Sequence, residues 1–322
     1  MKIAVIGAGA MGCLYGAYLS EKNEVIMIDS YKPQVDAINE NGITIVEEDK
    51  KEHVYKNVTA CLSGEYKEAA DWVIVFVKSN YTDSALEANA LIFGKNTIVM
   101  TLQNGAGNDR KISKYVDPEN IIIGTSTHNS VNLGGGKVFH GGLGITTIGS
   151  NHNAKKYLGM LSETLSAANF ETVVSDDIQR IIWSKLFVNL SINTFTAITG
   201  TTIGYMIEDE YAWNFAKRLV YEAIAVAEED GTYFDRREVM ESIKEVCIKL
   251  KNGYSSMYQD RKKGLKTEID AINGAVVEQA KIYGVPVPYN SLIVDLVHAI
   301  EGGDAFNRSL AEIGRASCRE RV

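Results

Sequence analysis

The sequence predicts two domains, a doubly wound parallel α/β sheet followed by an all-helical domain. In the first half, short continuous apolar runs alternate with helix-like segments, which is typical of buried parallel strands joined by crossover helices. Beyond residue 175 the apolar spacing is helical almost to the end. The chain has 322 residues, enough for two domains with sizeable cores. We therefore expect one domain at residues 1–174 and a second at residues 175–313.

Composition and charge narrow the classes of protein to consider. Apolar residues make up 45% of the chain and charged residues 23%, as in ordinary globular proteins. The formal net charge of −8 disfavours nucleic acid and anionic membrane as partners. The four cysteines are scattered, with no CxxC and no Cys/His cluster, so we expect no disulfide framework, no metal site and a reducing, cytoplasmic environment. Residues 314–322 change abruptly to an Arg-rich composition, and we interpret them as a tail foreign to the natural protein.

The N-terminal segment has the order of elements found in dinucleotide-binding proteins. Residues 2–6 form an apolar strand that runs into the sequence GAGAMG, and a helix follows to about residue 20. Residues 25–28 then form a second strand that ends at Asp29. A strand, a glycine turn, a helix and a strand followed by an acid about 20 residues later predict a Rossmann-type domain.

Each glycine of this turn has a physical role in binding a dinucleotide. Gly7 permits the tight turn, Gly9 lets the backbone approach a pyrophosphate, and Gly12 lets the helix pack closely on the strand. Ala10 and Met11 begin the helix, whose free N–H groups and dipole favour phosphate. The alternative is a glycine-rich turn that binds nothing.

Asp29 bears on which nicotinamide cofactor is used. A carboxylate at this position accepts hydrogen bonds from both ribose hydroxyls and repels a 2′-phosphate, which favours NADH over NADPH. Lys32 lies three residues later and could reach a 2′-phosphate, which weakens that preference. The alternative role for Asp29 is a helix N-cap.

Two further buried strands end in polar residues. Residues 71–77 lead to Lys78, and residues 97–102 lead to Asn104, so both side chains are expected at the ligand-binding edge of the sheet. A solvated strand-end lysine and an ordinary Asn-Gly turn are the alternatives. Residues 121–125 form another strand.

Alternating patterns predict antiparallel strands outside the parallel core. We expect a hairpin from residues 43–46 and 54–59, and an antiparallel extension of the sheet from residues 127–132, 137–140 and 144–148. The five histidines have no catalytic or metal-binding spacing, and we interpret all of them as structural or surface groups.

Residues 177–200 are long and apolar enough for a buried helix, yet they carry polar residues at intervals of four. Lys185, Asn189 and Asn193 therefore share one helix face. Polar groups on a buried face need polar partners, and either a small anionic substrate or a polar seam between helices would supply them. Further helices are predicted at residues 211–230, 236–250, 266–283 and 290–300, with Glu268 in a first turn where the helix dipole favours a carboxylate.

Seven segments together resemble the ketopantoate reductase (2-dehydropantoate 2-reductase) family, from the first strand to about residue 307. They are GAGAMG at 7–12, VFVKS around Lys78, LQNG at 102–105, WSKLFVNLSIN at 183–193, SSMYQD at 255–260, TEIDAING at 267–274 and PVPYN at 286–290. The resemblance implies a helical domain like the C-terminal domain of 6-phosphogluconate dehydrogenase. It also implies reduction of 2-dehydropantoate to D-pantoate with NADPH or NADH, for pantothenate and coenzyme A synthesis.

The resemblance also assigns roles to residues at matching positions. Lys185 would be the general acid, and Glu268 would bind the substrate hydroxyl or position Lys185. Asn104 would lie beside nicotinamide and substrate, and Lys78 would contact the cofactor. The remaining substrate contacts would come from Asn189, Asn193 and Ser256. A homodimer through the helical half rests on analogy alone.

Three other functions remain open from the sequence. Asp29 stands where NADPH-using members usually carry an arginine nearby, and relatives with an acid there resemble NAD-dependent D-2-hydroxyacid dehydrogenases acting on other 2-keto acids. A nucleotide-sensing regulator would bind the cofactor without turnover. A β-hydroxyacid dehydrogenase would have a similar architecture.

Overall fold

The computed structural model describes residues 1–152 and 154–319, with side chains as far as residue 307. Its contacts divide the chain into two compact units, Met1–Ile182 and Trp183–Val322. The division falls inside helix α6 (Ile178–Val188). Of the tail singled out in the sequence, residues 314–319 continue a helix backbone, and residues 320–322 lie outside the described residues.

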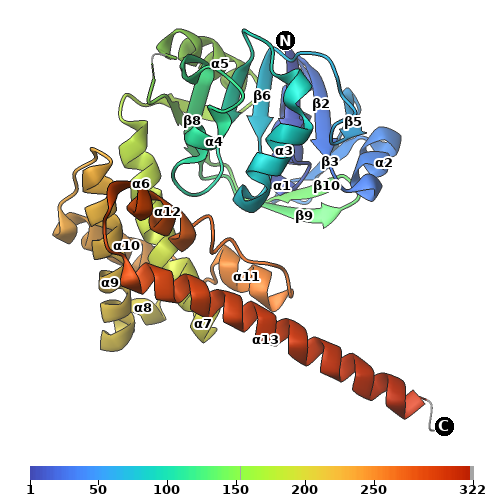
Figure 1. The fold of residues 1–322 in the computed structure, drawn as a ribbon. Coiled ribbons are helices and arrows are strands. Elements are labelled where there is room, and N and C mark those ends of the chain that lie inside the picture. The colour runs from blue at the N-terminus through green and yellow to red at the C-terminus, as the bar shows by residue number, and fades with distance from the viewer. Residues whose placement is uncertain (153, 320–322) are drawn as a thin grey trace. The chain divides into compact units, whose positions relative to one another are not determined.

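The first unit is built on an eight-stranded sheet (Figure 1). In spatial order its strands are β12 (Glu171–Val174), β11 (Ile145–Gly149), β8 (Ile121–Ser126), β7 (Ile98–Thr101), β6 (Trp72–Val75), β1 (Lys2–Ile6), β2 (Glu24–Asp29) and β5 (Val58–Leu62). The six strands from β8 to β5 are mutually parallel, and β11 pairs antiparallel with β8. This arrangement confirms the doubly wound sheet, whose strand order reverses direction between β1 and β6.

Alternate residues of the parallel strands are buried on opposite faces of this sheet. On one face Ile3, Val5 and Met27 pack with α1 and α5, and on the other Ala4 and Ile6 pack with α3 and α4. The helices of this unit are α1 (Ala10–Leu19), α2 (Lys32–Asn41), α3 (Thr82–Ala88), α4 (Asn108–Ile112) and α5 (Lys155–Ala167). Burial on both faces explains why these strands are continuously apolar in the sequence.

The structure confirms only part of each of the two expectations about the antiparallel strands. The hairpin is β3 (Ile43–Val46) with β4 (Glu52–Tyr55), and the expected strand at residues 54–59 gives way to β5, which joins the edge of the parallel sheet. β9 (Ser130–Gly134) and β10 (Lys137–His140) pair with each other, but they form a separate four-stranded sheet with β3 and β4. Of the three predicted extension strands, only β11 therefore extends the large sheet.

The second sheet packs its buried face against α1. Val138 of β10 and Ile43 and Ile45 of β3 belong to the same apolar cluster as the inner residues of α1. Period-two alternation in the sequence shows that one face of a strand is buried, but it does not show which element covers that face. The sequence could not therefore assign β9 and β10 to a sheet.

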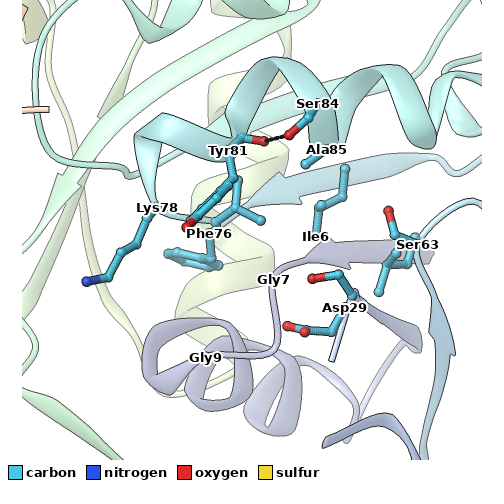
Figure 2. Close-up of a pocket in the computed structure, with 13 residues that line it drawn as sticks. Ile6, Gly7, Gly9, Asp29, Ser63, Phe76, Lys78, Tyr81, Ser84 and Ala85 are labelled. Carbon is cyan, nitrogen blue, oxygen red and sulfur yellow. Dashed lines mark hydrogen bonds between the residues drawn. The ribbon is translucent and has the colours of Figure 1, made fainter. Parts of the chain in front are cut away.

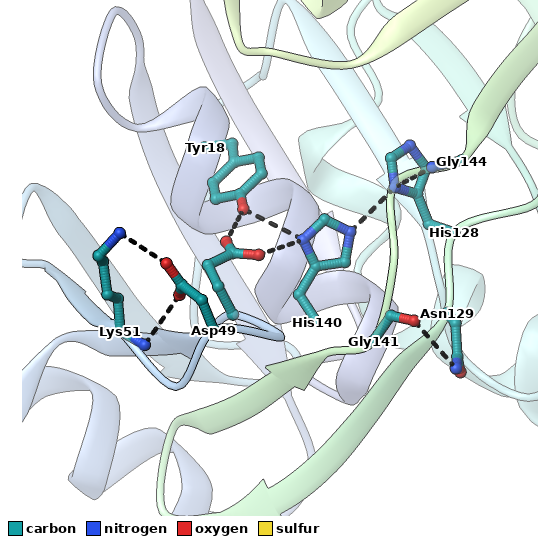
Figure 3. A network of polar contacts seen from close by, with 9 residues as sticks. Tyr18, Asp49, Lys51, His128, Asn129, His140, Gly141 and Gly144 are labelled. Atoms are coloured by element: carbon teal, nitrogen blue, oxygen red, sulfur yellow. Dashed lines mark hydrogen bonds and ion pairs between the residues drawn. The ribbon is translucent and has the colours of Figure 1, made fainter.

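A chain of polar side chains lies inside this contact (Figure 3). The hydroxyl of Tyr18 in α1 donates to Glu47 at 2.5 Å, and Nδ1 of His140 lies 3.0 Å from the other oxygen of that carboxylate. Nε2 of His140 lies 3.1 Å from Nδ1 of His128, to which the Gly144 N–H also donates. These two histidines are thus buried in contact with each other.

The second unit is helical, and it contains most of the long apolar segment predicted from the sequence. Its elements are the end of α6, a π turn at Asn189–Asn193, α7 (Thr194–Thr199), α8 (Tyr205–Glu208), α9 (Glu210–Glu229), α10 (Arg236–Lys249), α11 (Ser256–Lys262), α12 (Asn273–Tyr283) and α13 (Pro288–Arg319). Together α6, the π turn and α7 form one helix, Ile178–Thr199, which by length and composition could span a membrane. Its apolar window is 56% buried within the protein, as in a core helix.

Candidate active site

The glycine turn between β1 and α1 has the geometry that the sequence predicts. Gly7 has a φ of +104°, a conformation that side chains disfavour. A Cβ on Gly12 would overlap the carbonyl oxygen of Gly7, so only glycine lets α1 approach the turn this closely. A Cβ on Gly9 would meet nothing within 4 Å, so the backbone there borders open space. Ala10 and Met11 begin α1 beside that space.

Asp29 holds the turn as well as facing the cavity beside it. One carboxylate oxygen accepts the N–H of Ala8 at 2.7 Å, and the other accepts the N–H of Tyr31 at 2.8 Å. Each oxygen keeps a further lone pair, because an ionised carboxylate has about four acceptor sites. The helix-cap alternative fails, because Tyr31 and not Asp29 occupies the N-cap position of α2, and the side chain of Tyr31 makes no capping hydrogen bond to the described residues there.

Four of the predicted cofactor residues line one cavity of about 420 Å³ in the first unit (Figure 2). They are Gly7, Gly9, Asp29 and Lys78. The cavity lies at the carboxyl ends of β1, β2 and β6, on both sides of the point where the strand order reverses. Open space at Gly9, a helix N-terminus and a carboxylate beyond β2 fit the pyrophosphate and ribose of a dinucleotide.

Asn104 does not line this cavity, but it lies next to the residue that follows Lys78. The hydroxyl of Ser79 donates to the Asn104 carbonyl at 3.3 Å. Gln103, the residue before Asn104, donates its amide to the carbonyl of Val77 at 2.6 Å. The ends of β6 and β7 are thus tied together, as expected for neighbouring parallel strands.

The sequence did not single out several residues that also line the cavity. They are Ile6, Ile28, Ser30, Ser63, Phe76, Val77, Tyr81, Ser84 and Ala85. Ser63 is the residue that follows β5. Its backbone N–H donates to the Asp29 carbonyl at 3.0 Å. Assigning β5 to the parallel sheet would have placed Ser63 at the same edge as Asp29.

In the second unit, Lys185 is partly buried and electrostatically coupled to Glu268. Burial lowers the pKa of Lys185 to about 8, and the nearby Glu268 carboxylate opposes that decrease. Glu268 does not begin a helix, contrary to the sequence interpretation. It lies in a series of turns in which its carbonyl accepts the N–H groups of Ala271 and Ile272, and α12 begins only at Asn273.

Ser256 begins α11, which packs against the end of the Lys185 helix. The hydroxyl of Ser255, the preceding residue, contacts Oγ1 of Thr196 at 2.6 Å and donates to the Asn193 carbonyl at 3.4 Å. Ser255, which caps the start of α11, therefore contacts the backbone of Asn193. Asn189 and Asn193 are the first and last residues of the π turn.

Comparison with known proteins identifies relatives over nearly the whole chain. The family models Ketopantoate reductase PanE/ApbA and Ketopantoate reductase PanE/ApbA C terminal match residues 3–153 and 177–301. The 2-dehydropantoate 2-reductase of Streptococcus pyogenes is 30% identical over 307 residues, which cover 94% of this chain and 98% of the relative. That of Pyrococcus horikoshii is 33% identical over 302 residues, covering 94% and 98%.

A solved structure of D-mandelate dehydrogenase with NADH and anilino(oxo)acetate superimposes with a TM-score of 0.86. It is 32% identical and covers 95% of this chain and 100% of its own. The sheet, the glycine turn and these relatives define an oxidoreductase that uses a nicotinamide cofactor. The chain belongs to the ketopantoate reductase family.

Proposed function

We propose that this protein reduces 2-dehydropantoate to D-pantoate, with Lys185 as the proton donor and NADH as the hydride donor. The observation that carries the proposal is the placement of Lys185 on the long apolar helix with the Glu268 carboxylate nearby, where burial lowers the pKa of Lys185 to about 8. A lysine with this pKa is mostly charged at neutral pH and gives up its proton more readily than an ordinary lysine.

Reduction of a ketone requires a hydride at the carbonyl carbon and a proton at the oxygen. Bound reduced nicotinamide supplies the hydride. In the proposed step the Lys185 ammonium donates one proton to the ketone oxygen, so that Lys185 becomes neutral and a hydroxyl forms. Glu268 stabilises the ammonium before the transfer. Asn189, Asn193 and Ser256 are proposed to bind the carboxylate and hydroxyl of the substrate.

The preference for NADH rests on charge around Asp29. A 2′-phosphate about 5 Å from this carboxylate would be repelled by roughly 3 kcal/mol per unit charge at an effective dielectric constant of about 20. Lys32 could offset that repulsion, but its ammonium contacts both oxygens of Asp36, at 2.6 and 2.7 Å. We expect kcat/KM to be at least about tenfold higher with NADH than with NADPH.

A second candidate is an NADH-dependent D-2-hydroxyacid dehydrogenase that acts on other 2-keto acids. Asp29 favours it, and so does the likeness to D-mandelate dehydrogenase solved with NADH. Both candidates use the same proton donor and the same cofactor site, so only the substrate distinguishes them.

Steady-state kinetics with purified protein would test both candidates. The substrates are 2-dehydropantoate, pyruvate, 2-oxoisovalerate and phenylglyoxylate, each with NADH and NADPH. The highest kcat/KM with 2-dehydropantoate supports the first candidate, and the highest with another keto acid supports the second. Cofactor binding with no turnover of any keto acid would contradict both and favour a nucleotide sensor.

Lys185→Ala tests the proton donor separately. We expect kcat to fall by roughly 10²–10⁴, because one general acid is lost, with the Kd of NADH nearly unchanged. Lys249→Ala is the matched control, because Lys249 is an exposed lysine in the last turn of α10. Unchanged turnover in Lys185→Ala would remove Lys185 from the mechanism.

A further inference from the structure

The helix that carries Lys185, Asn189 and Asn193 contains a π turn at the two asparagines. In an α-helix a residue four positions later lies about 40° further round the axis, so three residues at intervals of four drift by about 80°. A π turn takes more than four residues, so the second interval falls short of a full turn. Asn193 is therefore rotated back toward the line of Lys185.

A π turn is rare because it disturbs the regular backbone hydrogen bonds, so it needs other partners. Ser191, within the turn, is fully buried, and its hydroxyl donates to the carbonyls of Phe187 and Val188, at 2.7 and 3.1 Å. The carbonyl of Leu190 accepts a hydrogen bond from the side-chain amide of Asn273, at 3.3 Å. One of the partners is thus local, and the other comes from the start of α12.

Asn273 is fully buried, and the hydrogen bonds around its side chain fix its orientation. Its amide nitrogen donates both to Leu190 and to Oδ1 of Asn290, which is 3.0 Å away. Its Oδ1 accepts the hydroxyl of Thr194 at 2.6 Å. Reversing the amide would place its oxygen against two other acceptors, so one orientation is selected.

Asn290 continues this chain of hydrogen bonds to a charged group. Its side-chain amide donates to the Leu219 carbonyl at 3.1 Å and to Glu222 at 2.8 Å. Glu222 on α9 also accepts the backbone N–H groups of Tyr289 and Asn290, in the first turn of α13. The π turn is therefore connected through two buried amides to α9, α12 and α13.

Asn273 also ends the segment that carries Glu268. In that segment the carbonyl of Glu268 accepts two backbone N–H groups that close a turn, and the chain then enters α12 at Asn273. One side chain thus ties the backbone near Glu268 to the helix of Lys185. The sequence contains this residue in TEIDAING, but no cofactor or substrate role is assigned to it.

We propose that Asn273 is a positioning residue that stabilises the π turn, aligns Asn189 and Asn193 with Lys185, and keeps Glu268 in register with them. This inference rests on the proposed function, because the alignment matters only if those side chains bind and protonate a keto acid. Asn273 itself acts through the helix and touches no reacting atom in this scheme.

The test compares Asn273→Ala and Thr194→Val with Asn120→Ala. Asn120 is a buried asparagine of the first unit, whose amide donates to the Lys95 carbonyl at 3.2 Å. We expect Asn273→Ala to raise KM for the keto acid and lower kcat, with kcat/KM reduced by about 10²-fold, because small displacements of catalytic groups have effects of that size. The Kd of NADH should stay within twofold of wild type. Asn120→Ala should lower Tm without raising KM.

Hydrogen–deuterium exchange supplies a readout that is independent of turnover. Well below Tm, Asn273→Ala should exchange faster in peptides covering residues 187–196, while Asn120→Ala should not. Thr194→Val removes a single hydrogen bond and serves if Asn273→Ala does not fold. A variant of Asn273 or Thr194 with wild-type KM and wild-type exchange in this segment would overturn the inference. If wild type reduces no keto acid but the exchange difference is present, the proposed function fails while the support of the π turn by Asn273 stands.

Discussion

The pKa of Lys185 predicts how the rate of ketone reduction depends on pH. The proposed step needs the charged lysine, because the ammonium supplies the proton. Burial lowers this pKa to about 8, from the ordinary lysine value of 10.5. The reduction rate should therefore be constant near neutral pH and fall as pH rises through 8. The reverse reaction needs neutral lysine as the base and should become faster over the same interval.

The size of the change follows from the pKa. With a pKa of about 8, roughly nine-tenths of the lysine is charged at pH 7 and one-tenth at pH 9. The kcat of reduction should thus fall about tenfold between these pH values. A lysine with an ordinary pKa would stay almost fully charged at pH 9, and the rate would hardly change.

The assay is kcat for NADH oxidation at saturating keto acid between pH 6 and 10. NADH deuterated at both C4 positions provides a check, because a primary isotope effect shows that hydride transfer limits the rate. The variant Glu268→Gln should shift the midpoint to lower pH, because its carboxylate opposes the effect of burial on Lys185. A flat profile to pH 9.5 with a full isotope effect would refute the assignment of Lys185.

Two further predictions concern the first unit. Gly12→Ala should destabilise the protein by about 1–3 kcal/mol in thermal melts, because the added Cβ would overlap Gly7. Gly9→Ala should leave Tm unchanged but weaken NADH binding at least about tenfold in fluorescence titrations. Burial and the neighbouring His140 lower the pKa of His128 to about 4, below the unfolded value near 6.5, so stability is full above pH 6.5 and declines as pH falls toward 4. Between pH 7 and 5 the protonation of His128 should lower the free energy of unfolding by about 2 kcal/mol. Urea melts of His128→Gln should lack that part of the decline.

The parallel core of the first unit could be predicted because its determinants are local. Continuous apolar strands, a glycine turn and a carboxylate after β2 each follow from short-range rules. The second sheet could not be predicted, because the covering of a buried strand face depends on tertiary packing. Glu268 was misplaced for a related reason, since turns closing on its own carbonyl delay α12 until Asn273.

The polar face of the long apolar helix was visible as a spacing of four, but its π turn was not. Ser191 was the one local signal, because a buried serine inside an apolar helix often bonds back to carbonyls of the preceding turn. The decisive partner, Asn273, lies 79 positions from Thr194. No periodicity within one helix can indicate such a distant contact.

Asp29 accepts hydrogen bonds from two backbone N–H groups, and this limits how the coenzyme preference can be changed by mutation. Replacing Asp29 with arginine, in order to bind a phosphorylated ribose, would also remove the hydrogen-bond acceptor of the Ala8 and Tyr31 N–H groups. Such a swap would loosen the loop that it is meant to adapt. A more promising design would leave the acid untouched and introduce positive charge at Ser30, the neighbouring residue that borders the same cavity.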